Sequence, residues 1–303
     1  MRDRALYANL GGASLALALP ALGGLARGGK AWMLWTLINL AVSFLAFGAM
    51  AKITPCNPTQ PAFATRELAD NALYWFMGAL LYGGLADLYI RGGASLLPGG
   101  SGAVSAIMAG YGWAARLPLA AQALLALLAM DFVQYWLHRL FHGDTLWPFH
   151  AVHHSAEQVD WTTGYRFHPV NFAVYSAGAL ALIKLIGFSP AAFVIMGPIN
   201  LVLGALLHAN LNWTFGPLRY VIASPVYHRW HHVKDPKARN CNFAPTFPIL
   251  DLMFGTYYMP AGELPSDYGV EGAPTSFLAQ LVYPFQVIAG RFARPRKAGA
   301  ASA

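Results

Sequence analysis

The chain has 303 residues, of which 56% are hydrophobic and only 11% charged, against about 25% charged in an ordinary soluble domain. Together with a mean hydropathy of +0.43, this composition favours a membrane protein. The net charge is +7, but the basic residues lie at segment ends and in two clusters, so they fit anionic lipid headgroups better than nucleic acid. The two cysteines, Cys56 and Cys241, are too few for a disulfide framework or a four-thiolate iron–sulfur cluster.

Apolar segments before the first histidines predict several membrane helices. Residues 1–29 fit a weak first membrane helix better than a cleaved signal peptide, because further hydrophobic segments follow at once. Residues 31–51 form the clearest span, with about the 20 residues that a crossing needs. Residues 71–90 and 117–137 are two further candidates, and the last of these runs directly into HRLFH.

A second group of apolar segments predicts a helical hairpin. Residues 172–188 and 190–207 are both short and apolar and meet near Pro190, so we expect the chain to enter the bilayer and return. Histidines on either side of such a paired crossing emerge on the same side and can meet. Basic residues in the range 229–239 favour the cytoplasmic side for them. Residues 276–292 are too short and interrupted for a span and predict an interfacial helix.

Eight of the ten histidines fall into three clusters with the spacings HxxxH, HxxHH and HxxHH. Residues i, i+3 and i+4 share one face of a helix, so each cluster can aim two or three imidazoles at a common point. Eight imidazoles exceed the ligands of one tetrahedral zinc and suit two metal ions that share a site. The predicted metal ligands are His138, His142, His150, His153, His154, His228, His231 and His232.

The residues around the clusters indicate which elements carry them. Ser224 followed by Pro225 is a helix-start signal, which places the third cluster in the first turns of a helix. Asp131 lies seven residues before His138 on one predicted helix. This carboxylate either hydrogen-bonds an imidazole, as metal-bound histidines commonly require, or caps the helix at the membrane surface.

Two histidines stand outside the clusters and flank the predicted hairpin. His168 lies before it, in RFHPVN, and His208 lies just after it, in HANLNW. Each of them either completes a metal coordination shell or hydrogen-bonds at a helix end. Asn210 and Asn212 are weaker candidates for oxygen ligands.

Missing motifs narrow the chemistry. The chain has no HExxH, so a zincin-type protease would lack its glutamate base. It has no GxSxG elbow for a serine hydrolase, and neither a GxGxxG nor a Walker loop for a nucleotide. The remaining pattern is histidine-rich, carboxylate-poor and apolar.

From about Asp131 to Pro260 the sequence resembles the sterol desaturase and fatty acid hydroxylase superfamily of integral-membrane, non-haem di-iron oxygenases. The blocks that carry the resemblance stand in the order DFVQYWLHRLFH, WPFHAVHHS, WTTGYRFHP, HANLNW, SPVYHRWHH and DLMFGTYYMP. Pattern and resemblance together predict an all-α, multi-span helical membrane protein whose cytoplasmic, histidine-rich helical cap holds a dimetal site. We expect membrane helices over residues 1–115, the catalytic region over 116–260, and an interfacial helix with a basic tail over 261–303.

The resemblance implies that the eight clustered histidines bind two iron ions, with His168 and His208 as additions. It also implies that dioxygen and two external electrons, from a ferredoxin or a cytochrome with its reductase, are used to hydroxylate or desaturate a lipid. Near the site, the aromatic residues either line a lipid channel or form an interfacial belt. They are Trp161, Tyr165, Trp213 and Trp230.

Alternatives remain within and outside this chemistry. Desaturation of the C-5 sterol type, or ether-lipid cleavage of the alkylglycerol monooxygenase type, would use the same site. A membrane metal-binding or transport protein is the alternative from another class, and it predicts histidines inside the spans rather than between them. A zinc-dependent membrane hydrolase is disfavoured by the missing glutamate. The Ala-, Gly- and Arg-rich composition favours a bacterial inner membrane, with the site on the cytoplasmic side.

Overall fold

The computed structural model describes residues 30–63, 65–78, 81 and 112–293. Within these ranges the regular structure is helical, apart from one isolated bridge between Val233 and Tyr268, so the all-α prediction is confirmed for them. The long helices are α3 (Lys30–Ile53), α6 (Leu119–Phe141), α8 (Pro169–Ile186) and α9 (Pro190–His208). The shorter labelled α-helices are α7 (Trp147–His154), α10 (Pro225–His231), α11 (Ile249–Met253) and α12 (Phe277–Ala293). A further helix, without a label, covers residues 68–78. Short 3-10 turns lie at η1 (Trp113–Arg116), η2 (Thr163–Tyr165) and η3 (Gly216–Tyr220).

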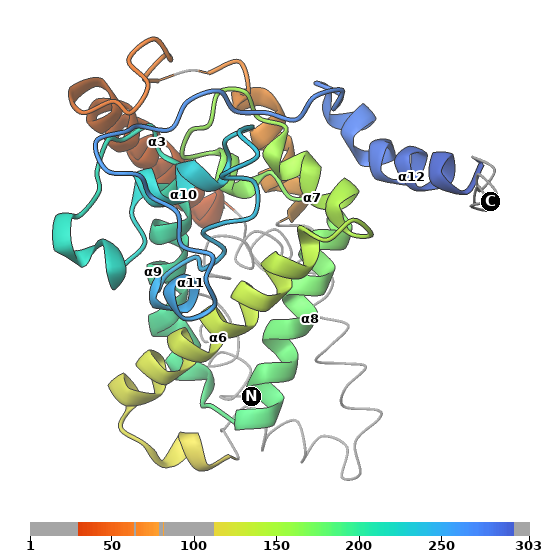
Figure 1. Ribbon diagram of the computed structural model, residues 1–303. Coiled ribbons are helices and arrows are strands. Elements are labelled where there is room, and N and C mark those ends of the chain that lie inside the picture. Colours follow the sequence, from red (N-terminus) through yellow and green to blue (C-terminus); the bar gives the residue numbers. More distant parts are fainter. Residues whose placement is uncertain (1–29, 64, 79–80, 82–111, 294–303) are drawn as a thin grey trace.

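Helices α6, α8 and α9 form the body of the molecule, and α6 packs against both of the others. The predicted hairpin is confirmed as a pair of helices. Gly187, at a φ of 70°, ends α8 in the left-handed conformation that glycine adopts without strain. Ser189 then precedes Pro190 at the first position of α9. Because α8 runs away from α7 and α9 returns, the C-terminus of α9 lies at the same end as the C-terminus of α6 (Figure 1).

The short helices α7 and α10 cover that end. Pro148 lies in the first turn of α7 and Pro225 in the first turn of α10. The predicted cap is confirmed, because the Ser224 hydroxyl accepts a hydrogen bond from the backbone N–H of Tyr227 at 3.2 Å. Both helices are almost entirely buried, so their histidines are fixed by the surrounding packing.

Helix α6 is long and apolar enough to cross a membrane by length and composition, and among the described residues it alone meets both criteria. Apolar side chains such as Leu124, Phe132 and Trp136 face outward from it. Helix α3 covers the predicted segment 31–51 and confirms that segment as a helix. The predicted segment 1–29 and most of 71–90 lie outside the described residues.

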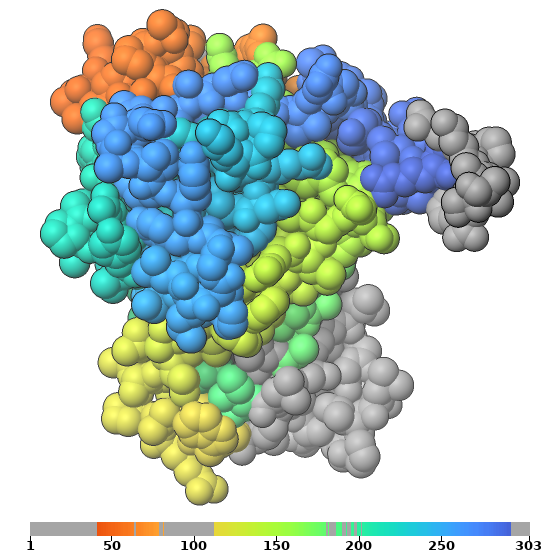
Figure 2. Space-filling model, viewed as in Figure 1, coloured from red at the N-terminus to blue at the C-terminus, as the bar shows by residue number. Residues whose placement is uncertain are grey.

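Helix α12 extends from the edge of the molecule in Figures 1 and 2, where it contacts α7. It covers the predicted segment 276–292 and confirms that segment as a helix. Leu278, Val282 and Phe285 are exposed along it. Gln280 ties its first turn to the molecule through a hydrogen bond to the Ser155 hydroxyl at 3.1 Å.

Candidate metal centre

Nine of the ten histidines lie in two groups, and within each group the candidate ligand atoms are all within 4.8 Å of one another. The five-histidine group consists of His138, His142, His150, His154 and His231. The four-histidine group consists of His153, His208, His228 and His232. All eight clustered histidines predicted from the sequence are therefore brought together, and His208 joins them.

The two groups are immediate neighbours. Across the boundary between them, the ring centroids of His154 and His232 lie 4.5 Å apart, and those of His231 and His228 lie 5.3 Å apart. Each HxxHH triplet is divided between the groups rather than aimed at one point, as the sequence had led us to expect. In the triplet of α7, His153 belongs to the four-histidine group and the other two histidines to the five-histidine group. In the triplet of α10, His231 belongs to the five-histidine group and the other two to the four-histidine group.

Helical geometry explains the division. The side chains of residues i and i+4 lie one above the other on a helix face. Those of residues i+3 and i+4 are consecutive, so they point in different directions around the helix axis. The pair His150 and His154 accordingly belongs to the five-histidine group, and the pair His228 and His232 to the four-histidine group. The odd residue of each triplet reaches across to the other group, so α7 and α10 both contribute to both.

Backbone carbonyls hold several of the rings in place. The Nδ1 atom of His138 lies 2.8 Å from the Phe243 carbonyl oxygen, and that of His231 lies 2.6 Å from the Cys241 oxygen. In the other group, Nδ1 of His208 lies 2.7 Å from the Gly204 oxygen. A carbonyl oxygen can only accept a hydrogen bond, so these Nδ1 atoms carry the proton and leave Nε2 with a free lone pair.

The free Nε2 atoms point inward. Those of His138, His142, His154 and His231 are buried without a hydrogen-bond partner, which is costly for a polar atom. In the four-histidine group, the Nε2 atoms of His153 and His208 face each other at 3.3 Å.

His153 and His208, whose Nε2 atoms face each other, both donate a hydrogen bond from Nδ1–H to a carbonyl oxygen. For His153 the acceptor is the Arg166 oxygen at 3.2 Å, and for His208 it is the Gly204 oxygen. Two nitrogen lone pairs that face each other cannot form a hydrogen bond, but they can both coordinate a cation. The donor set therefore fits transition-metal ions, for which imidazole is a common ligand.

Burial keeps these imidazoles in the form that binds metal. It lowers the pKa of His154 and of His232 well below the ordinary value of 6.5, and the neighbouring imidazoles lower both further. The same holds for the pKa of His153 and of His228. The rings are thus neutral at physiological pH, and neutral imidazole is the metal-binding form.

Two predicted residues lie apart from the groups. His168 uses Nε2 toward the Leu281 carbonyl at 3.1 Å and accepts from the Val170 N–H on Nδ1 at 3.2 Å. Both of its ring nitrogens are engaged, so it does not join the metal groups and instead helps to dock α12. The buried carboxylate of Asp131 accepts a hydrogen bond from the Phe247 N–H at 3.0 Å, so its contacts do not support the predicted role of orienting an imidazole.

Sequence reasoning missed a buried arginine beside the four-histidine group. Arg166, whose carbonyl oxygen meets His153, donates from Nη2 to the Glu67 carboxylate at 2.6 Å and from Nε to the Asn71 amide oxygen at 2.6 Å. The residues of this pair are 99 positions apart, and Arg166 is only 1% exposed. No local motif could have identified it, because its partners come from another part of the chain.

A second missed arginine, Arg229, is fully buried between ligands of α10. It donates to the carbonyl oxygens of Val159 at 2.6 Å and His208 at 3.0 Å, and it also contacts the amide oxygen of Asn57. Its guanidinium stacks over the ring of Tyr268. The His208 carbonyl ends α9, and a cation is favourable at such a C-terminus, so Arg229 fixes the end of the helix that carries His208.

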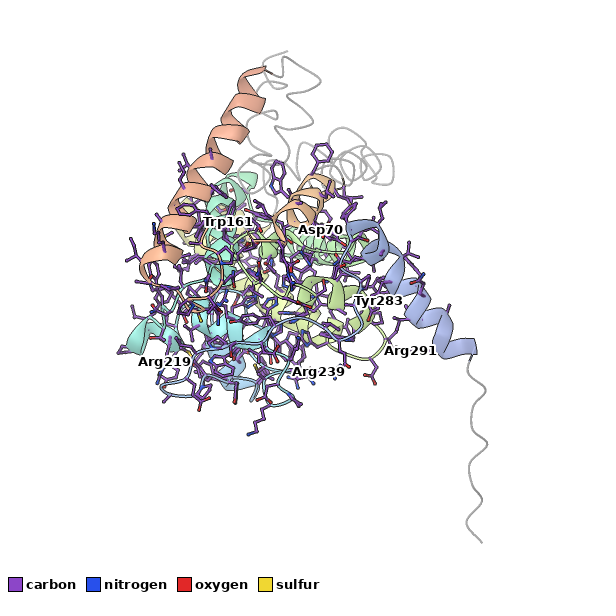
Figure 3. The ribbon with its side chains drawn as sticks, turned by 90° about the horizontal axis from the view of Figure 1, so that it is seen from above. Asp70, Trp161, Arg219, Arg239, Tyr283 and Arg291 are labelled. Atoms are coloured by element: carbon purple, nitrogen blue, oxygen red, sulfur yellow. The ribbon has the colours of Figure 1, made fainter. Side chains whose placement is uncertain are left out.

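The four predicted aromatic residues occupy three environments. Trp161 and Tyr165 line a cavity of about 440 Å³ between α3 and the helix at residues 68–78, and Figure 3 shows Trp161 between α3 and Asp70 of that helix. Trp213 donates to the Thr54 hydroxyl at 2.9 Å. Trp230 packs edge-on against Tyr258 at 5.4 Å. The last two line no part of this cavity.

Two adjacent groups of buried imidazoles, enclosed by helices, define the described part of the chain as a helical fold with a candidate polyhistidine metal centre. Residues 123–256, which carry most of α6 and all of α7 to α11, match the fatty acid hydroxylase family. This match confirms, for these residues, the resemblance predicted from the histidine blocks.

Individual relatives are lipid-modifying enzymes. The chain is 34% identical over 175 residues to an ornithine lipid hydroxylase of Rhizobium tropici, covering 57% of this chain and 53% of the relative. It is 33% identical over 136 residues to an alkylglycerol monooxygenase of Xenopus tropicalis, covering 44% and 30%. A very-long-chain aldehyde decarbonylase of Oryza sativa is 30% identical over 153 residues, covering 46% of each. The aligned part thus spans about half the length of these relatives or less, and no solved structure matches the chain significantly.

Proposed function

We propose that the protein is a membrane-bound, non-haem di-iron oxygenase that hydroxylates a C–H bond of a lipid. The observation that carries this proposal is the pair of histidine groups, because each offers four or five converging imidazoles and imidazole suits iron. The similarity to a lipid hydroxylase and a lipid monooxygenase supports the reaction class. The nine histidines of the two groups are the proposed ligands.

Two bound iron ions would supply the activation of dioxygen, with electrons from an external ferredoxin or from a cytochrome and its reductase. The protein's own part is to hold the ligands and exclude water. Carbonyl oxygens of Phe243, Cys241, Gly204 and Arg166 orient the imidazoles. Burial of the groups removes solvent that would quench a reactive oxidant.

The proposed setting is a bacterial inner membrane that several helices cross, with the histidine end as a cytoplasmic cap. The outward apolar face of α6 supports a position in the bilayer. Histidines of the two groups lie in the last turns of α6 and α9, His138 in the first and His208 in the second. Basic residues over 229–239 follow directly and support the cytoplasmic orientation.

Ether-lipid cleavage is a second candidate, and the similarity to alkylglycerol monooxygenases favours it. Oxygenation of the carbon beside an ether oxygen would give an unstable product that separates into an alcohol and an aldehyde. The same iron centre would serve both reactions, as it would a desaturation. Placement of the substrate by about an ångström decides between such outcomes.

Lipid mass spectrometry and metal analysis test the proposal together. Cells that produce the protein should contain a lipid that is heavier by one oxygen atom, or an aldehyde from an ether lipid, and only when grown in air. The purified protein should contain about two irons per chain, as a dimetal site requires. A single tightly bound zinc with no change in any lipid would overturn the proposal.

A further inference from the structure

The apolar cavity of about 440 Å³ lies outside the metal groups and is lined by parts of the chain that are distant in sequence. One wall comes from α3, with Ala41, Phe44 and Leu45, and another from the helix at residues 68–78, including Ala72 and Trp75. Its volume is within the ordinary range for a ligand site, about 300 to 1,000 Å³. Most of the residues that line the cavity precede residue 123, where the match to the fatty acid hydroxylase family begins.

The third wall connects the cavity to the metal centre. Trp161 and Tyr165 line the cavity, while Gly164 between them packs against the last turn of α9. A Cβ atom on Gly164 would lie 3.1 Å from Nδ1 of His208 and 3.0 Å from the Gly204 carbonyl oxygen. One stretch of backbone therefore separates the cavity from a ligand of the four-histidine group.

Two polar side chains of the wall, those of Asn71 and Thr162, are hydrogen-bonded within the protein. The Asn71 amide donates to the Thr162 hydroxyl at 2.7 Å and accepts from Arg166 at 2.6 Å. The Thr162 hydroxyl donates in turn to Asp160 at 2.5 Å. A headgroup, or the hydroxyl of a sterol, would lose its hydration here without gaining these partners. A hydrocarbon chain has no such requirement.

The two helices that line the cavity also carry exposed apolar side chains. Val42 and Leu45 on α3 are 58% and 61% exposed, and Leu73 and Phe76 on the other helix are 47% and 55% exposed. Exposed large apolar side chains on both helices suit contact with a bilayer rather than with water.

We propose that this cavity holds the far end of one unbranched hydrocarbon chain of the lipid and thereby selects lipids by chain length. The proposal rests on the proposed function, since the chain belongs to the substrate of the metal centre. Each buried methylene contributes about 0.8 kcal/mol, so every methylene that the cavity can no longer hold should lower the relative kcat/KM for a long chain about fourfold.

Cavity-filling variants test this directly. Ala72→Phe and the milder Ala72→Leu should shift the preference of the purified, membrane-reconstituted enzyme from long-chain to short-chain lipids with the same headgroup, and Ala41→Phe should do the same from the opposite wall. Ala46→Phe is the matched control, because Ala46 is an exposed alanine of α3 that does not line the cavity. An unchanged chain-length preference in Ala72→Leu with retained turnover would overturn the proposal, and so would a cavity already filled by another part of this chain.

A second measurement does not depend on turnover. Lipids brominated near the methyl end of the chain should quench the tryptophan fluorescence of the wild-type protein, and Trp161→Phe with Trp75→Phe should remove most of that quenching. Ala72→Phe should weaken it, whereas a brominated sterol should not cause it. Quenching without any oxidised lipid would contradict the proposed function while supporting the cavity. Oxidised lipid without quenching would support the proposed function and contradict the role of the cavity.

Discussion

The two histidine groups use the same side chain but are supported by different parts of the molecule. In the five-histidine group, His138, His231 and His142 are positioned by residues 240–243, a loop after α10, and His142 is only partly buried. The four-histidine group is fully buried, and its support comes from α9 and from residues 161–166. The two histidine groups therefore share the same kind of side chain but differ in their surroundings. Substitutions around one group should affect that group more than the other.

Removal of a ligand should have the largest effect. His231→Ala in the five-histidine group and His228→Ala in the four-histidine group should each reduce activity by more than about 100-fold, since loss of a mere outer partner already costs about 10- to 100-fold. Iron content per chain and lipid product, both by mass spectrometry, are the measurements.

His168→Ala is the matched control, because both nitrogens of His168 hydrogen-bond outside the groups. It should keep its iron and most of its activity. Loss of iron in His168→Ala equal to that in His228→Ala would show that the division of the histidines is wrong.

Loss of the buried ion pair between Glu67 and Arg166, beside the four-histidine group, should have the next largest effect. Glu67→Gln leaves the guanidinium of Arg166 buried without its carboxylate, and breaking such a pair costs about 3 to 5 kcal/mol. Displacement of Arg166 also moves the carbonyl oxygen that orients His153. Urea unfolding and iron analysis should show a destabilised protein whose remaining iron is bound mainly by the five-histidine group.

The chain offers an exposed ion pair for comparison. Arg66 and Glu157 also form a salt bridge, but their side chains are 59% and 51% exposed, so Glu157→Gln should cost only about 0 to 1 kcal/mol. Equal effects of Glu67→Gln and Glu157→Gln on unfolding would count against a structural role for the buried pair.

In the five-histidine group, Asn240→Ala removes the amide oxygen that lies 3.3 Å from Nδ1 of His142. The affinity of the five-histidine group for iron should fall about 10-fold, the low end for an outer partner, because this bond is long and partly exposed. Competition with a chelator measures it. Asn212→Ala, at an exposed asparagine, serves as the control, and a change confined to the four-histidine group would contradict the assignment.

The smallest effect should come from Gly164→Ala. The new methyl would stand 3.1 Å from His208 and 3.0 Å from the Gly204 oxygen, and overpacking of this kind costs at least about 1 kcal/mol. Gly204→Ala meets nothing within 4 Å and should be neutral or slightly stabilising in a helix. Thermal unfolding with and without iron compares the two, and equal melting temperatures would argue against close packing at Gly164.

The sequence was most informative where the signal is local. Spacing alone predicted the eight clustered histidines, the hairpin of α8 and α9 and the Ser224 cap. It could not decide between His168 and His208, because each lies at an end of the hairpin and only the packing of α12 engages the ring of His168.

The division of each triplet was also beyond the sequence. The three histidines of the third cluster lie within five consecutive residues at the end of α10, and which of them faces which group depends on the rotation of α10 against α9. The Arg166 pair and the cavity were likewise beyond the sequence, since both are made by segments about 100 positions apart.

The order of the ligands along the chain has a consequence for biosynthesis. Four of the five proposed ligands of one group, from His138 to His154, precede α8, whereas three of the four in the other begin with His208, the last residue of α9. A nascent chain grows from its N-terminus at about 5 to 20 residues per second. The ribosome therefore completes most of the first group several seconds before the second, and we expect the two proposed metal ions to be captured one after the other during synthesis.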